Sequence, residues 1–246
     1  MRDRLLIWGG LGAITLLAWV YLARMPMSSE SAMDAMGMAM PMAHRWTAGD
    51  MWLVFLMWAV MMVAMMLPSA GPMVLMYARV ATGRGSAARL NVWLFAFGYV
   101  IVWTLFSALA TIVQNALQSA SLVSDGLRAT PLLGGLILIA AGVYQLTPLK
   151  TACLTHCRSP IGFFATEWRD GAVGAVVMGI RHGAFCVGCC WMLMLLLFVA
   201  GVMNLLWIAA LSVLVLVEKV SGYGRPIATV AGAGLIASGL LLVAFR

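Results

Sequence analysis

Long apolar stretches constrain the fold of this chain more than any other feature of its sequence. They begin near residues 5, 50, 90, 132, 183, 205 and 226. A hydrocarbon core of about 30 Å is crossed by roughly 20 helical residues, and each of these stretches approaches or exceeds that length. Of the whole chain 64% is hydrophobic and only 9% is charged, so its surface cannot face mainly water. The sequence therefore predicts an all-α fold, a polytopic transmembrane helical bundle of about seven spans.

The first apolar stretch, residues 5–23, follows a basic MRDR start, as the apolar region of a signal peptide would. It is longer than the usual apolar region of a signal peptide, and no small-x-small cleavage site follows it. We therefore expect residues 1–24 to form an uncleaved membrane anchor helix. The remainder divides into a methionine-rich loop, residues 25–48, and a multi-span membrane domain, residues 49–246.

The basic residues predict the orientation of the spans, because cytoplasmic loops of membrane proteins are enriched in Lys and Arg. With the N-terminus inside, Arg24, Arg45, Arg128 and Arg246 lie outside and all other basic residues lie inside. The inner set is Arg2, Arg4, Arg79, Arg84, Arg89, Lys150, Arg158, Arg169, Arg181, Lys219 and Arg225. We therefore expect a cytoplasmic N-terminus in a bacterial inner (plasma) membrane. The distribution of basic residues in these loops accounts for the net charge of +7, so the charge does not indicate a nucleic-acid partner.

The loop after the first stretch reads MPMSSESAMDAMGMAMPMAH, from Met25 to His44, and is dense in methionine with few other large apolar residues. The orientation above makes it periplasmic. Thioethers are ligands chiefly for Cu(I), and they bind without losing a proton. A linker of accidental composition or a methionine sink for oxidants remains the alternative. The predicted ligands here are Met33, Met36, Met38, Met40, Met42 and His44.

All five cysteines fall in two short windows, residues 153–157 and 186–190. Residues three or four apart share a helix face, so Cys186 can pair with Cys189 or Cys190. The inner loop is expected to bring the first window to the same cytoplasmic end of the bundle. Thiolates and imidazole suit Cu(I), Zn(II) or an iron-sulfur cluster. The predicted metal ligands are Cys153, His156, Cys157, His182, Cys186, Cys189 and Cys190.

The thioethers of the outer loop and the thiols at the cytoplasmic end are both ligands for Cu(I). We therefore expect Cu(I), with zinc as the possible alternative. The predicted function is Cu(I) capture, transfer or homeostasis, with a periplasmic copper-binding protein or copper enzyme as a possible partner and oligomerisation left open. Two other functions remain: a membrane thiol-disulfide oxidoreductase, or an accessory subunit with a structural zinc site. No P-loop, G-x-S-x-G or H-E-x-x-H motif occurs, which points away from an enzyme without excluding one. No catalytic residue is predicted.

Several local features carry expectations of their own. Pro68 and Pro72 should kink or end the second span near Leu67, and the methionines of that span are expected to fill a core. Residues 171–180 are expected to form a short interfacial or re-entrant helix. Glu218 and Lys219 either pair with each other at a helix end or take part in the site. The last span is rich in glycine and alanine and should pack closely on a neighbour.

Two sequence patterns resemble a known family. They are TPLK-x-x-C-x-x-x-C-R-x-P and G-x-F-C-V-G-C-C-W-M-L-M, followed by a later E-K. They are similar to those of a bacterial family described as predicted metal-binding integral membrane proteins, a domain of unknown function, over most of residues 50–245. The resemblance implies a multi-span inner-membrane protein that binds a metal. It covers the five cysteines, whereas His156 and His182 are proposed from spacing alone.

Overall fold

The computed structural model describes residues 2–24, 46–81, 88–123 and 128–245, and within them the chain is helical. The predicted all-α fold is therefore confirmed. The helices are α1 (Arg2–Arg24), α3 (Ala48–Ala81), α4 (Ala88–Ser119), α5 (Pro131–Gln145), α6 (Pro148–Arg158), α7 (Pro160–Glu167), α8 (Gly171–Leu195), α9 (Leu197–Ala200), α10 (Leu205–Val220) and α11 (Gly224–Ala244). Between α4 and α5, Val123 and Ala129 form an isolated antiparallel bridge.

Five of the described helical segments are long and apolar enough to cross a membrane: Leu6–Arg24, Ala48–Ala81, Ala88–Ser119, Gly171–Ala200 and Gly224–Ala244. Helices α5 and α6 meet at an angle of 64° and bring the number to six if the bent pair forms one span. The predicted number of about seven spans is not confirmed. Helix α10 has 16 residues, fewer than the roughly 20 that a full crossing takes.

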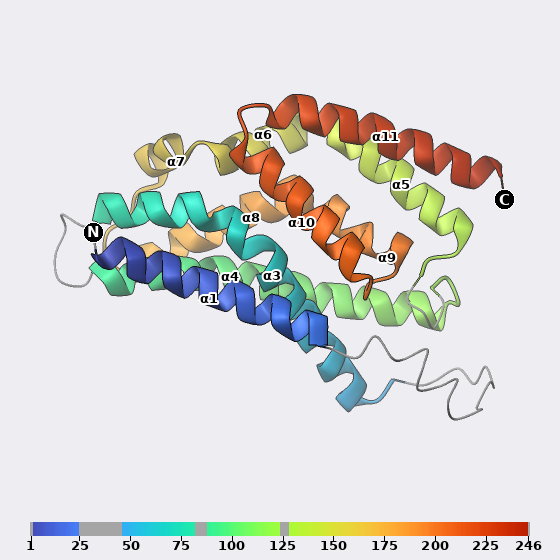
Figure 1. Ribbon diagram of the computed structural model, residues 1–246, viewed down its shortest axis with the longest axis horizontal. Coiled ribbons are helices and arrows are strands. Elements are labelled where there is room, and N and C mark those ends of the chain that lie inside the picture. The colour runs from blue at the N-terminus through green and yellow to red at the C-terminus, as the bar shows by residue number, and fades with distance from the viewer. Residues whose placement is uncertain (1, 25–45, 82–87, 124–127, 246) are drawn as a thin grey trace.

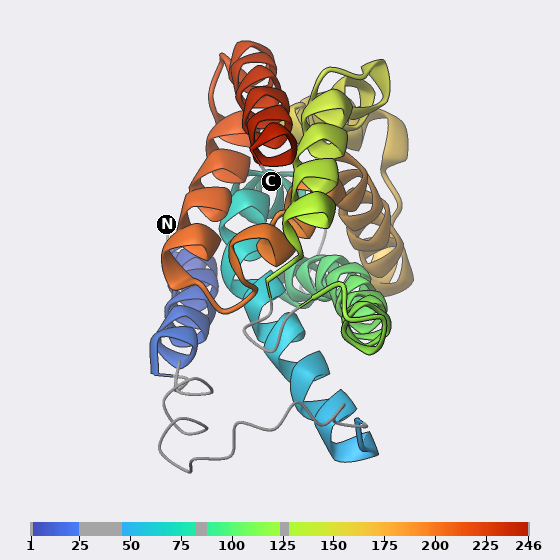
Figure 2. The ribbon, with the colours of Figure 1, turned by 90° about the vertical axis from the view of Figure 1, so that its right-hand side faces the viewer.

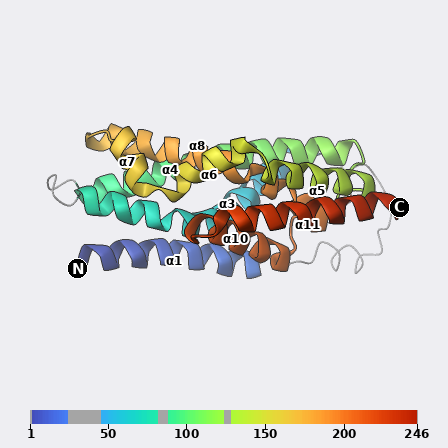
Figure 3. The same ribbon diagram turned by 90° about the horizontal axis from the view of Figure 1, so that it is seen from above.

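The helices lie lengthwise, with α3 running through the middle of the bundle (Figures 1 and 2). At one end of the molecule α1 begins, α3 ends, and α4 and α8 begin (Figure 1). Helices α5 and α11 form a pair on one side, and they lie side by side in the view from above as well (Figure 3). Four methionines of α3, Met61, Met62, Met65 and Met66, are fully buried, so these thioethers fill the core.

Helix α3 bends rather than ends at its prolines. It continues through Pro68 and Pro72 to Ala81, while its ribbon changes direction along its length (Figure 1). Proline lacks an amide hydrogen, so Pro68 leaves the Ala64 carbonyl without its helical partner. Trp19 Nε1 of α1 donates to that carbonyl oxygen at 3.1 Å. Neighbouring helices thus satisfy the backbone that the bend exposes.

Helix α8 runs unbroken from Gly171 to Leu195, so the expected separate interfacial or re-entrant helix over residues 171–180 is wrong. Its first half packs against α4 backbone to backbone, because a side chain at Gly179 would collide with the Phe95 carbonyl and one at Gly98 with the Val176 carbonyl. This support from α4 explains why the segment continues as one helix. The close crossing fixes the part of α8 that precedes the cysteines.

The α5–α11 pair confirms the close packing expected of the glycine-rich last span. We expect Gly142→Ala to lower the stability of the protein by about 1–3 kcal/mol, the usual cost of overpacking. A Cβ there would lie 2.6 Å from the Gly232 carbonyl oxygen and 2.9 Å from the Ile236 nitrogen. The matched control is Gly234→Ala on α11, where a Cβ meets nothing within 4 Å. Thermal unfolding in detergent should separate the two variants, and equal melting temperatures would contradict the packing argument.

Candidate metal centre

Helix α8 carries three cysteines into the core, and all of them are free thiols. Cys186, Cys189 and Cys190 are each at most 2% exposed. The thiols of Cys189 and Cys190 donate to the Cys186 carbonyl oxygen at 3.1 and 2.9 Å. This is the contact that helical geometry gives to residues three and four positions apart. The spacing therefore places the Cys186 sulfur on one turn of the buried helix and the Cys189 and Cys190 sulfurs on the next.

Helix α6 brings the first cysteine window to the second. Thr147 caps α6 by accepting from the Lys150 amide at 3.3 Å, and Pro148 occupies its first turn, both of which are common helix-start signals. The Sγ atoms of Cys157 and Cys189 lie 4.0 Å apart. Cys153 Sγ lies beside Gly188, where a Cβ would be only 2.9 Å away. The two windows thus meet, as expected from the sequence.

Two further helices converge on Cys186 through polar side chains. Lys219 Nζ of α10 donates to Cys186 Sγ at 2.8 Å and to Ser69 Oγ of α3 at 3.1 Å. The Tyr99 hydroxyl of α4 lies 3.0 Å from the same sulfur and donates to the Met66 carbonyl at 3.0 Å. Cys186 therefore sits in contact with an ammonium and a phenol, and sequence reasoning missed both Tyr99 and Ser69.

Glu218 and Lys219 do not pair with each other. Glu218 Oε2 instead accepts from Lys150 Nζ of α6 at 2.6 Å, and Glu218 Oε1 accepts from Gln145 Nε2 of α5 at 2.9 Å. Successive residues on a helix do not face each other, which explains why the first of the two alternatives left open by the sequence, a Glu218–Lys219 pair, does not form. The two neighbours serve different clusters: Lys219 contacts the thiols, and Glu218 ties α10 to the α5–α6 bend.

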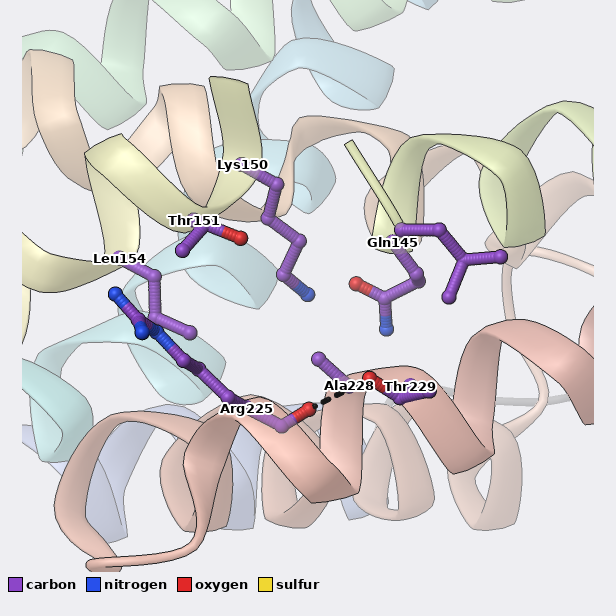
Figure 4. A pocket seen from close by; sticks show the side chains of 8 residues that line it. Gln145, Lys150, Thr151, Leu154, Arg225, Ala228 and Thr229 are labelled. Atoms are coloured by element: carbon purple, nitrogen blue, oxygen red, sulfur yellow. Dashed lines mark hydrogen bonds between the residues drawn. The ribbon is translucent and has the colours of Figure 1, made fainter. Parts of the chain in front are cut away.

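A cavity of about 310 Å³ opens next to this ion pair. Figure 4 shows the Lys150 and Gln145 side chains extending toward it from α6 and α5, opposite α11. Its lining combines an ammonium, a guanidinium, an amide, hydroxyls and aliphatic groups, without the sulfur that a soft metal needs. The cavity is therefore separate in chemistry from the thiol cluster. Its lining residues are Gln145, Leu146, Lys150, Thr151, Leu154, Arg225, Ala228 and Thr229.

The two histidines predicted as ligands lie in different environments. His182 is buried, and its ring stacks against Tyr99 with centroids 5.4 Å apart and against Phe95 at 6.1 Å. Its Nδ1 is buried and has no hydrogen-bond partner. His156 is exposed, stacks on Phe185 at 4.4 Å, and places its Nδ1 2.9 Å from the Ala152 carbonyl. His182 thus keeps an available ring nitrogen one turn before Cys186, whereas His156 packs on the outside of α8.

Few metal-binding side chains gather at one point in the described part of the chain. Within the described part of the chain, no three His, Cys, Asp or Glu side chains are grouped so that they could hold a metal ion. The predicted ligands of the outer loop lie outside the described residues: Met33, Met36, Met38, Met40, Met42 and His44. Among the described residues, Cys157 and Cys189 bring two thiols from different helices to within 4.0 Å of each other.

The geometry of this pair defines what the site can bind. A metal–thiolate bond is about 2.3 Å long for zinc, so two such bonds span up to about 4.6 Å. The 4.0 Å between the Cys157 and Cys189 sulfurs therefore suits an ion held between two thiolates from adjacent helices. Soft sulfur ligands select ions such as Cu(I). The fold and the site together define an all-helical protein with several candidate membrane spans and a buried thiol pair suited to a soft metal.

Comparison with known protein families agrees with that chemistry. The family model PpoB2, described as copper chaperone, matches residues 55–242. The chain belongs to this family. The match runs from α3 to α11 and includes both cysteine windows, and it supports a copper-related role for the chain. Neither the search of curated proteins nor the search of solved structures found a match.

Proposed function

We propose that this chain is an integral membrane copper chaperone that holds Cu(I) between Cys157 and Cys189 and hands it to a partner protein. The single observation that carries the proposal is the 4.0 Å separation of those two sulfurs in a member of a copper chaperone family. The two thiols come from different helices, so loading and release need only a small relative movement of α6 and α8.

The chemistry of the pair favours Cu(I) over harder ions. Two thiolates satisfy a soft monovalent ion, while Mg²⁺ and Ca²⁺ take oxygen ligands. The nearby thiols of Cys153, Cys186 and Cys190 offer further sulfur to an ion that leaves one partner for another. A site with spare sulfur at short range supports transfer by stepwise ligand exchange, which is what a chaperone requires.

The exposed faces of the helices support a membrane location. Leu16 and Leu17 of α1 are 65% and 68% exposed, and only 17% of the apolar windows in α1 and α11 is buried inside the protein. Such faces need lipid as their solvent. Arg79 lies in the last turn of α3 and Arg89 in the first turn of α4, at the end of the molecule where α1 starts. This distribution supports a multi-pass protein of the bacterial inner membrane with a cytoplasmic N-terminus.

In this orientation residues 25–48 face the periplasm and collect Cu(I). The sulfur atoms of Met33, Met36, Met38, Met40 and Met42 are neutral, so capture requires no proton release, and His44 adds an imidazole. The partner is a periplasmic copper-binding protein or a copper enzyme. The thiol pair then serves as the tighter site, because thiolates carry the negative charge that thioethers lack.

Metal analysis and a handover assay test the proposal. Protein purified anaerobically from copper-fed cells should retain copper through gel filtration, and it should give that copper up to an added Cu(I) chelator of higher affinity. Deleting residues 25–42 should slow loading in cells and leave the affinity of the purified protein unchanged. A chain purified from copper-fed cells without copper, or with zinc in its place, would refute the proposal.

The thiol geometry also favours a second candidate, a thiol-disulfide oxidoreductase. Two free cysteines whose sulfurs are 4.0 Å apart need to approach to about 2.05 Å to form a disulfide. Acid trapping in cells distinguishes the two functions. A redox carrier must show an oxidised fraction of the Cys157–Cys189 pair, whereas a copper chaperone keeps both thiols reduced during its work.

A further inference from the structure

Lys219 is a buried cation without a carboxylate partner in the described part of the chain. Its side chain is 7% exposed, and its hydrogen bonds go to Cys186 Sγ and Ser69 Oγ. The adjacent carboxylate, Glu218, is occupied by Lys150 and Gln145. An ammonium taken out of water is costly unless a negative group compensates it. The ammonium contacts the thiol cluster, whose sulfur atoms carry negative charge once they are deprotonated.

The ammonium is held in place by its surroundings. Ser69 comes from α3, just beyond the bend at Pro68, and Cys186 from α8, so two helices fix Lys219 Nζ. Cys189 follows Cys186 by three positions, and such residues have Cβ atoms about 5–6 Å apart on a helix. The positive charge therefore stays close to the thiol pair, in an interior where charges are weakly screened.

We propose that Lys219 makes the site selective for a monovalent metal ion. Two thiolates and Cu(I) leave one negative charge, which the ammonium neutralises. Two thiolates and Zn(II) are already neutral, so the ammonium leaves one uncompensated positive charge in the buried site. Lys219 thus favours Cu(I) and disfavours Zn(II) at the same two sulfurs. This inference rests on the proposed Cu(I) site and names the residue that sets its selectivity.

The selectivity follows from charge and not from ligand identity, because two thiolates alone also suit zinc. Zinc is also bound by thiolates in proteins, so the choice of sulfur as donor does not exclude it. A fixed positive charge provides that discrimination without adding a ligand. Lys219 is therefore a positioning and specificity residue that touches Cys186 but does not coordinate the ion.

Competition titrations with chelators test the inference on the full-length protein in detergent, with Cu(I) and Zn(II) measured separately. Lys219→Met should weaken Cu(I) binding by roughly tenfold or more, because the positive charge that compensates the single negative charge of the loaded site is lost. The same variant should bind Zn(II) as tightly as the parent or more tightly. A loss of Cu(I) affinity that exceeds any loss of Zn(II) affinity is the signature of charge selection, and a larger loss for Zn(II) would contradict it.

Three variants control for altered packing. Lys219→Arg keeps the positive charge and should retain the preference for Cu(I), whereas Lys219→Gln removes the charge and should behave as Lys219→Met does. Ser69→Ala removes only the neutral partner of Nζ and should change both affinities by less than the Lys219→Met effect on Cu(I). If Lys219→Met were too unstable to titrate, the comparison of Lys219→Gln with Lys219→Arg decides the matter.

The outcomes separate this inference from the proposed function. Equal weakening of both metals in Lys219→Met, or no change in either, would overturn the role of Lys219 while the parent protein still binds copper. A parent protein that binds no Cu(I) would overturn the proposed function and the selectivity together.

Discussion

Cys189→Ser is expected to lower the affinity for Cu(I) by roughly 100-fold or more, because loss of a group that merely orients a ligand already costs about 10–100-fold. Cys157→Ser should have an effect of the same size, since the two sulfurs bind from opposite sides of the 4.0 Å gap. Anaerobic competition with a Cu(I) chelator measures both. The double variant should be little worse than either single variant, because the bridge is lost when one thiol is removed.

Cys190→Ser is the matched control for this prediction. Cys190 is as buried as Cys189, stands next to it on α8, and donates to the same Cys186 carbonyl oxygen. A serine hydroxyl can make that hydrogen bond, so the local packing should survive and the Cu(I) affinity should change only a few-fold. If Cys190→Ser lost as much affinity as Cys189→Ser, the site would not be centred on the Cys157–Cys189 pair.

The helices of this protein could be predicted from the sequence because apolar runs of membrane length leave few other structures possible. The number of spans could not. Hydropathy does not show where a helix ends and the chain changes direction. Here α5 ends at Gln145 and α6 starts anew after Thr147, with Pro148 in its first turn. Those two residues are a cap and a first-turn proline, so a signal for the start of α6 was present at that point.

At residues 171–180 the sequence suggested a break between two helices that the structure does not have. Arg181 and His182 interrupt an apolar run that is longer than one membrane crossing needs, which suggested a separate interfacial helix, but in the structure these residues belong to one continuous helix, α8. What decides the outcome is the glycine contact between Gly179 and the Phe95 backbone, which is a property of two helices together. A single segment read alone carries no information on such a partner.

The thiol site also has a part that the sequence could predict and a part that it could not. The cysteines on α8 were predictable, because three- and four-residue spacings fix one helix face. The contacts from Tyr99 and Lys219 were not, because these residues lie 87 and 33 positions from Cys186 in the chain. No local pattern marks a tyrosine that will meet a cysteine across two helices. Lys219 had a weaker signal, since a lysine at the end of an apolar helix beside an acidic residue needs a partner other than that neighbour.

Glu218→Gln is expected to destabilise the fold by about 3–5 kcal/mol, the usual cost of removing one partner of a buried ion pair. Lys150 and Glu218 are 1% and 2% exposed, and their charged atoms are 2.6 Å apart. The glutamine cannot neutralise Lys150, whose ammonium then remains buried beside the α5–α6 bend. Chemical or thermal unfolding in detergent should show a large loss of stability.

The control is Glu167→Gln at the ion pair between Arg181 and Glu167, where the arginine side chain is 45% exposed. Such a pair contributes about 0–1 kcal/mol, so this variant should unfold close to the parent. The double variant Lys150→Met with Glu218→Leu should regain much of the stability lost in Glu218→Gln, since it leaves no unpaired buried charge. If Glu218→Gln were no worse than Glu167→Gln, Lys150 would have to reach water in the folded protein. The ion pair would then not hold α10 in position, and the placement of Lys219 beside the thiols would need another support.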